Sequence, residues 1–140
     1  MASRPSNQWH IRSKLWLEIE GHPIIGEGRL AMLEAIHRQR SMLEASRETG
    51  ISYRRMRGAI RDMERVIGCA LVATYRGGTA GGRSELTPTA LALLNAFKAL
   101  TAGFRFEADV RFQKFFETFA RRLADSADRT LRRDPHDSGR

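Results

Sequence analysis

Apolar and polar residues alternate near the start of the chain, and the period then changes to that of helices. Residues 15–19 place Leu15, Leu17 and Ile19 at every second position, which is typical of a half-buried strand. Residues 21–23, Gly-His-Pro, interrupt this pattern, and the pair Ile24-Ile25 favours a short second strand. We therefore expect a β-hairpin ahead of the first helix.

Three helices are predicted next, each from its end signals. Residues 28–40 carry apolar side chains at helical spacing. Ser41 and Glu44 are typical of a capping box that begins a second, short helix, which Gly50 ends in the left-handed conformation. Ser52 is the N-cap candidate for a third helix. The expected buried positions of that helix are Met56, Ala59, Ile60, Met63 and Ile67.

A second hairpin and a long helical segment complete the expected architecture. Residues 70–75 and 84–86 have strand character and flank the glycine-rich segment 77–82. The sequence Thr87-Pro88 indicates an N-cap followed by proline in the first helical position. We expect the helical segment to extend to about residue 124 and residues 125–140 to form a polar, disordered tail.

Composition and charge narrow the class of protein. The 140 residues suffice for one domain and an appended helix. Lys and Arg outnumber Asp and Glu by 24 to 16, a net charge of +8 that favours a polyanionic partner. No apolar run approaches the ~20 residues that span a bilayer, and residues 1–13 lack the apolar stretch of a signal peptide. We expect a cytoplasmic protein, located at the nucleoid, with no membrane partner.

Residues for catalysis or metal binding do not cluster along the sequence. Cys69 is the only cysteine, which excludes an intrachain disulfide, and its apolar neighbours predict that it is buried. The four histidines have no metal-ligand spacing. Residues 77–84 are one substitution from a phosphate-binding P-loop, but Arg83 replaces the lysine and a strand follows instead of a helix. We expect no enzymatic activity, no metal and no cofactor.

Candidate chemistry lies on the third helix. When its apolar positions are buried, Arg54, Arg57, Gly58 and Arg61 share the opposite side. The guanidinium fork binds guanine edges or phosphates, and glycine allows the helix backbone to approach a partner closely. Two helices joined at Gly50 indicate a helix-turn-helix whose second helix enters the major groove of DNA. The alternative is a solvated, charged helix face without a partner.

The second hairpin and the C-terminal helix suggest two further contacts. Arg76 and Arg83 flank the hairpin loop, as expected of a wing that places cations beside DNA phosphates. The alternative is a long loop without a role. The apolar stripe of the C-terminal segment predicts a homodimer, with membrane-surface binding as the alternative. The expected dimer residues are Leu94, Phe97, Phe112, Phe115, Phe116, Phe119 and Leu123.

These pieces together resemble the DNA-binding domain of ModE-type, molybdate-responsive bacterial regulators, which is related to the LysR-type winged helix. The resemblance covers roughly residues 12–100 and is carried by residues 14–19, 26–30, 49–55, 77–82 and 86–88. It implies a homodimer whose third helix, from Ser52 to Arg61, reads operator DNA, with Ser52, Tyr53, Arg54 and Arg55 at matching positions. Arg57 stands at a commonly aromatic position and Glu64 at one that is commonly asparagine. The family's C-terminal oxyanion-binding domains have no counterpart here, so no molybdate site is identifiable.

The sequence therefore predicts an α+β fold, a winged helix-turn-helix with an N-terminal β-hairpin and a long C-terminal dimerisation segment. Its expected parts are a flexible N-terminus (1–11), the DNA-binding domain (12–87), the dimerisation helix or helices (88–124) and the tail (125–140). The expected function is a sequence-specific transcriptional regulator that binds double-stranded DNA as a homodimer. The alternative is a nucleoid-associated or adaptor protein that uses the same fold for non-specific DNA or protein binding.

Overall fold

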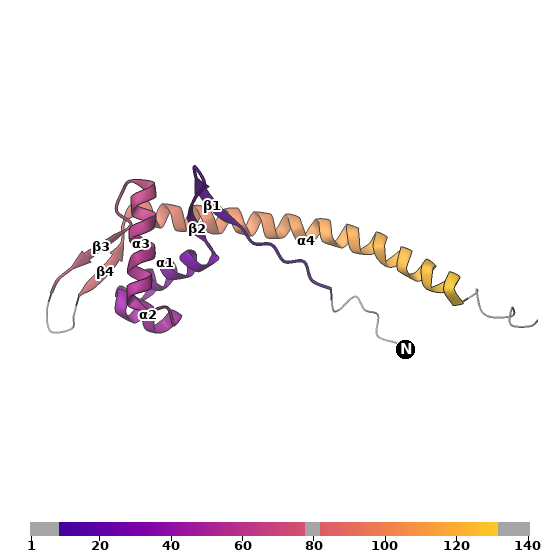
Figure 1. Ribbon diagram of the computed structural model, residues 1–140, viewed down its shortest axis with the longest axis horizontal. Helices are drawn as coiled ribbons and strands as arrows, with labels where there is room; N and C mark the ends of the chain where they lie inside the picture. Colours follow the sequence, from indigo (N-terminus) through magenta and orange to yellow (C-terminus); the bar gives the residue numbers. More distant parts are fainter. Residues whose placement is uncertain (1–8, 78–81, 132–140) are drawn as a thin grey trace, which may run out of the picture. The chain divides into compact units, whose positions relative to one another are not determined.

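The computed structural model describes residues 9–77 and 82–131, and within them the fold is mixed α+β (Figure 1). The elements follow in the order β1 (Trp16–Ile19), β2 (His22–Gly26), α1 (Glu27–Gln39), α2 (Met42–Thr49), α3 (Tyr53–Ile67), β3 (Val72–Tyr75), β4 (Arg83–Leu86) and α4 (Pro88–Leu131). Contacts divide the chain into two units. The core unit is residues 14–102, and the described part of the terminal unit is residues 9–13 and 103–131.

Local signals set the ends of the short helices as the sequence predicted. The Ser41 hydroxyl accepts a hydrogen bond from the Glu44 backbone N–H at 3.2 Å, while the Glu44 carboxylate binds Arg47. Gly50 ends α2 with φ 70°, a left-handed conformation that glycine adopts without steric cost. The Ser52 hydroxyl caps α3 by accepting from the Arg55 N–H at 3.2 Å. These contacts satisfy backbone donors that a helix end otherwise leaves free.

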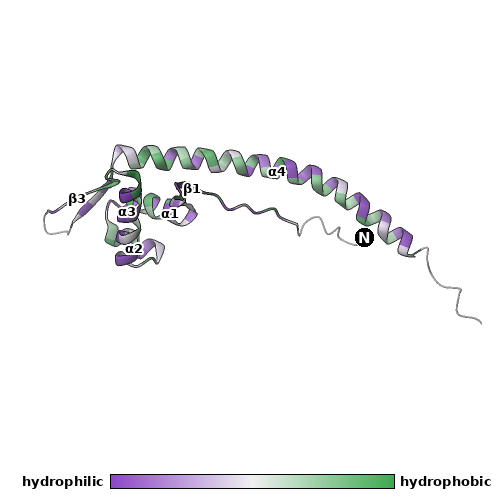
Figure 2. Ribbon diagram, turned by 45° about the horizontal axis from the view of Figure 1, so that its top comes forward, coloured by the Kyte–Doolittle hydropathy of each residue, from purple (hydrophilic) through white to green (hydrophobic). Residues whose placement is uncertain are grey.

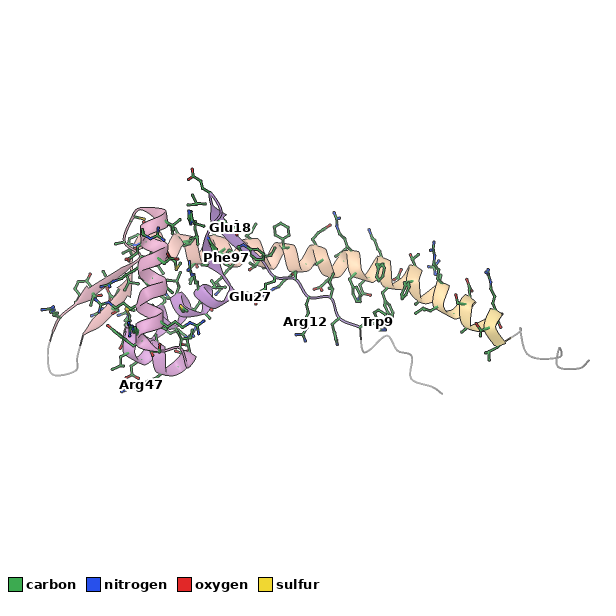
Figure 3. The ribbon with its side chains drawn as sticks, in the orientation of Figure 1. Trp9, Arg12, Glu18, Glu27, Arg47 and Phe97 are labelled. Atoms are coloured by element: carbon green, nitrogen blue, oxygen red, sulfur yellow. The ribbon has the colours of Figure 1, made fainter. Side chains whose placement is uncertain are left out.

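The hydrophobic core of the core unit is built from all three short helices, both hairpins and the first turns of α4. Met56, Ile60 and Met63 of α3 are buried in it, as predicted. Leu94 and Phe97 of α4 are only 5% and 1% exposed, so they pack against their own chain (Figure 3). The expectation that these two residues form a dimer contact is therefore wrong, because the same fold already covers them.

The β3–β4 hairpin is tied to the helices through its backbone. The Glu64 carboxylate of α3 accepts hydrogen bonds from the backbone N–H groups of Leu71 at 2.8 Å and Val72 at 3.2 Å. The Ser84 N–H donates to the Arg40 carbonyl at 3.0 Å, which joins β4 to the end of α1. Because these are main-chain contacts, they fix the base of the hairpin relative to α1 and α3.

The β1–β2 hairpin is present, but β1 is not the half-buried strand that its alternating sequence predicted. All four residues of β1 are exposed, and Trp16 remains 55% exposed. Only β2 enters the core, through Ile24 and Ile25. A two-stranded sheet can bury one strand against the helices while the other stays at its outer edge, which explains the difference.

Cys69 is exposed, contrary to the expectation. It follows Gly68, which ends α3 in a left-handed conformation at φ 84°. The apolar run around Cys69 is therefore divided between the end of a helix and the start of β3. Cys69 and Ala70 lie in the connecting turn and are exposed, whereas Leu71, which follows them, is buried in the core.

Helix α4 continues through Gly103 and ends at Leu131, so it includes seven residues that we expected in a disordered tail. Within this last stretch, the Thr130 hydroxyl donates a hydrogen bond to the Ser126 carbonyl at 2.9 Å. Hydrophobic and hydrophilic residues alternate along α4 (Figure 2). In the described residues, no helix combines the length and apolarity needed to cross a bilayer.

Candidate nucleic-acid interface

One side of α3 faces solvent and carries a concentrated positive charge. Burial of Met56, Ile60 and Met63 on the opposite side fixes this orientation. The exposed side forms an open cavity of about 360 Å³. Its lining residues, which we call the arginine surface, are Tyr53, Arg54, Arg57, Gly58 and Arg61. The sequence predicted this grouping from a spacing of three and four residues, and α3 places these residues on one side.

In the described part of the chain, the cations of the arginine surface have no acidic partner. Among the described residues, none of Arg54, Arg57 and Arg61 lies within ion-pair distance of a carboxylate. Other basic side chains of the core unit do have such partners. The pairs are Arg29–Asp62, Arg38–Glu48, Arg40–Glu85, Arg47–Glu44, Arg65–Asp62, Arg83–Glu85 and Lys98–Glu34. Three cations without an ion pair in the described part of the chain therefore share one face of α3.

Asp62 is the acid nearest in sequence to Arg61, but its carboxylate is engaged elsewhere. It accepts hydrogen bonds from Arg65 at 2.6 Å and from Arg29 at 2.8 Å. These bonds, Arg65 first and Arg29 second, lower the pKa of Asp62 below its ordinary value. Arg29 also donates to the carbonyls of Pro23 and Ile24, so the arrangement joins β2, α1 and α3. The charge of Asp62 is thereby used for the fold and not for neutralising Arg61.

Of the other residues predicted on α3, Ser52 and Arg55 lie outside the cavity and Tyr53 lines it. Ser52 uses its hydroxyl to cap the helix. Arg55 is exposed in the first turn but is not among the residues that line the cavity. Tyr53 does line it and is 43% exposed, which leaves its ring accessible to a partner.

The two predicted hairpin cations differ from each other. Arg76 is exposed after β3, whereas the Arg83 guanidinium forms an ion pair with Glu85 on the same strand. Glu85 also lies 4.0 Å from the Arg40 guanidinium. The spacing of two residues, which places Arg83 and Glu85 on one face of a strand, was a signal for this pair. Residues 78–81 of the predicted hairpin loop lie outside the described residues.

Sequence reasoning missed the side chains that hold this face in place. Glu64 was singled out only for its residue type, yet its carboxylate binds the hairpin backbone to α3. The Arg65–Asp62 contact follows a readable spacing of three residues. The Arg29–Asp62 contact joins residues 33 apart and gave no local signal.

The histidine, cysteine and acidic side chains of the described residues do not form a metal site. Within residues 9–77 and 82–131, no three or more His, Cys, Asp or Glu side chains are placed to hold a metal ion.

The pKa of Glu48 is lowered below its ordinary value by hydrogen bonds, from Gln39 first and from Arg38 second. This lowering is typical of a carboxylate in a surface ion pair.

The fold and this site define a small α+β unit with a basic helix face. The chain is similar to two curated proteins of Rhodobacter capsulatus. It is 37% identical over 79 residues to the molybdenum-pterin-binding protein MopB, which is 56% of this chain and 29% of that protein. It is 32% identical over 94 residues to the molybdenum-pterin-binding protein MopA, which is 67% of this chain and 36% of that protein.

The chain thus spans about a third of the length of the curated relatives it matches. No family model matches it. The similarity supports the ModE-like resemblance at its coarse level, as a relationship to bacterial molybdenum-pterin-binding proteins. The names of these relatives do not state a function for the arginine surface.

Proposed function

We propose that the chain is a DNA-binding transcriptional regulator and not an enzyme. In this proposal α2 and α3 form the helix-turn-helix and the β3–β4 hairpin forms the wing of a winged-helix domain. The observation that carries it is the arginine surface, where Arg54, Arg57 and Arg61 lie together. Among the described residues, no carboxylate lies within ion-pair distance of these three arginines. Such a surface is complementary to a polyanion.

The proposed mechanism places α3 in the major groove with its capped N-terminus leading. An α-helix fits the width of that groove, and arginine can take two acceptors on a guanine edge. Arg57 and Arg61 are assigned to base edges, with Arg54 at the N-terminal turn on a base or phosphate. Arg76 and Arg83 are assigned to phosphates beside the groove, and Arg83 must leave Glu85 to reach them.

The named activity of the relatives is not assigned to this chain. Molybdenum-pterin binding is stated for MopA and MopB, of which the chain matches about a third. We identify no molybdate-binding residue here. The proposal is limited to DNA recognition by the core unit, at the nucleoid of a bacterial cytoplasm.

Salt dependence of binding tests the proposal directly. Two copies of the surface and the hairpin cations would neutralise roughly 6 to 10 phosphates, which gives a log-log slope of about −5 to −9 between affinity and salt concentration. Fluorescence anisotropy with a labelled duplex from low to moderate salt measures this slope. A slope near zero would remove DNA as the partner, and equal affinity for unrelated duplexes would favour a nucleoid-associated role.

We further propose that the terminal unit makes a homodimer through an aromatic stripe on α4. The stripe consists of Phe112, Phe115, Phe116, Phe119 and Leu123, spaced three and four residues apart. Phe115 and Leu123 are 54% and 45% exposed, and Trp9 lies against only Phe116 and Phe119, with ring centroids 6.0 and 5.9 Å away. A second copy of the stripe would cover the remainder.

A pair of matched substitutions tests the dimer. Phe115→Glu places a charge on the stripe, whereas Phe106→Glu places the same charge on the other side of the helix, nine residues earlier. We expect sedimentation at micromolar concentration to give a monomer for Phe115→Glu and a dimer for the wild type and Phe106→Glu. A monomeric wild type, or equal behaviour of both variants, contradicts the stripe as the interface.

A further inference from the structure

Gly58 is an unfavourable residue for the place it occupies. It lies near the middle of the 15-residue helix α3 and faces solvent. Within a helix, glycine is less favourable than every other residue except proline, because it loses the most backbone freedom on folding. A glycine that the fold does not require is therefore a candidate for a role toward a partner, and its surroundings decide whether it has one.

The fold of the chain supplies no such reason. A Cβ atom added at Gly58 would meet no heavy atom within 4 Å, so close packing does not demand its absence. Gly50 and Gly68 differ, because they end helices at φ 70° and 84°. Gly58 is not among the residues with a positive φ. Neither sterics nor backbone geometry inside the chain explains a glycine at this position.

The surroundings of Gly58 point outward. Arg54 is four residues before it and Arg61 three residues after it, so each lies one turn away on the same side of α3. Arg57 is its neighbour, and all four residues line the same cavity. Gly58 is thus the bare backbone within a ring of long cationic side chains. A partner attracted by the arginines comes closest to the helix backbone at this point.

We propose, resting on the DNA-binding function above, that Gly58 determines specificity by admitting a base edge directly against the backbone of α3. The major groove is about 12 Å wide and a helix about 10–12 Å across, so the outermost part of the helix face meets the groove floor. Base edges form that floor, while phosphates line its sides. A methyl group at residue 58 occupies the space of the base edge and holds the whole helix away from it.

The test compares two glycine-to-alanine variants in the full chain. Gly58→Ala removes the bare backbone, and Gly28→Ala is the matched control, because Gly28 is also helical and exposed, with nothing within 4 Å of an added Cβ. Gly28 belongs to α1 and is not part of the arginine surface. Binding is measured to a duplex that the wild type enriches from a random-sequence pool and to an unselected duplex.

We expect Gly58→Ala to raise Tm by about 2 to 5 °C, because alanine favours a helix interior, and Gly28→Ala, in the first turn of α1, to raise Tm by less. Gly58→Ala lowers the affinity for the enriched duplex by about tenfold or more, with a smaller loss on the unselected duplex. Gly28→Ala leaves both affinities unchanged. A more stable protein that reads DNA less well is an outcome that a purely structural role of Gly58 does not produce.

Each contrary result has a distinct meaning. If the wild type binds neither duplex at low salt, the proposed function fails and this inference fails with it. If the wild type binds and Gly58→Ala binds equally well, only the inference is overturned. An equal loss on both duplexes overturns the base-edge contact in favour of a phosphate contact. A lowered Tm for Gly58→Ala shows that the fold itself needs the glycine and also overturns the inference.

Discussion

Arginines on α3 and arginines on α1 and α2 look alike in the sequence and differ in the structure. Arg38 lies against Glu48, and Arg47 against Glu44 on a part of α2 that faces solvent (Figure 3). Arg57 and Arg61, in contrast, have no carboxylate within ion-pair distance among the described residues. Some arginines of the core unit are thus neutralised by ion pairs, whereas three on one face of α3 have no ion pair in the described structure.

The difference between paired and unpaired arginines indicates which charges stabilise the fold. Exposed ion pairs contribute about 0 to 1 kcal/mol each to stability, so the paired arginines help the fold slightly. Like charges three and four residues apart on a helix cost about 0.2 to 0.5 kcal/mol. The arginine surface therefore works against folding. Such an arrangement is explained by a partner that supplies the missing negative charge.

The largest effect is expected from removing one unpaired arginine. Arg57→Ala should weaken binding to the enriched duplex by about 1 to 3 kcal/mol, the value of one base contact, without lowering Tm. Arg47→Ala, which removes a paired arginine from α2, should change the affinity by less than about 0.5 kcal/mol. Anisotropy titrations of both variants measure this. Equal losses would mean that pairing does not distinguish functional from structural arginines in this chain.

A smaller effect is expected from converting a paired arginine into an unpaired one. Glu85→Gln removes the carboxylate that binds Arg83, which then reaches phosphates without first breaking an ion pair. Affinity should rise about two- to fivefold for enriched and unselected duplexes alike, because phosphates carry no sequence information. Glu48→Gln frees Arg38 away from the arginine surface and serves as the control. If Glu48→Gln raises the DNA affinity by the same factor, the change in net charge alone explains the effect of Glu85→Gln.

The smallest effect concerns acid stability, to which the carboxylates paired with arginines should contribute and the arginine surface should not. The folded-state pKa values of Asp62 and Glu48 are lowered, so their stabilisation is present above the unfolded pKa values and is lost as the pH falls through the folded ones. Asp62→Asn should therefore flatten the decline of the unfolding free energy below about pH 4. Urea denaturation at stepped pH measures it. Arg61→Ala should leave the pH dependence as it is, and an equal flattening there would contradict the comparison.

Much of the local structure could be predicted because its causes are local. Ser41, Gly50 and Ser52 act within one helical turn, and each ends or begins a helix where the sequence indicated. The arginine surface was predictable for the same reason, since helical spacing alone brings Arg54 and Arg61 onto one side.

Burial was harder to predict because it depends on what packs against a residue. Cys69 and the β1 strand have apolar neighbours in sequence but no covering element in space, so they are exposed. Phe97 belongs to an apolar pattern that continues along α4, yet it is covered by the core unit. The period of a pattern tells which residues share a side, and only the fold tells what lies opposite.

The separation between the arginine surface and the rest of the fold has a consequence for how this chain can change over time. Arg54, Arg57 and Arg61 contribute no ion pair to the described structure. A Cβ atom added at Gly58 would meet no heavy atom within 4 Å. Replacing these four residues alters the surface while the buried side of α3 stays as it is. The exposed side of α3 can therefore change its sequence while the residues that hold the fold together are retained.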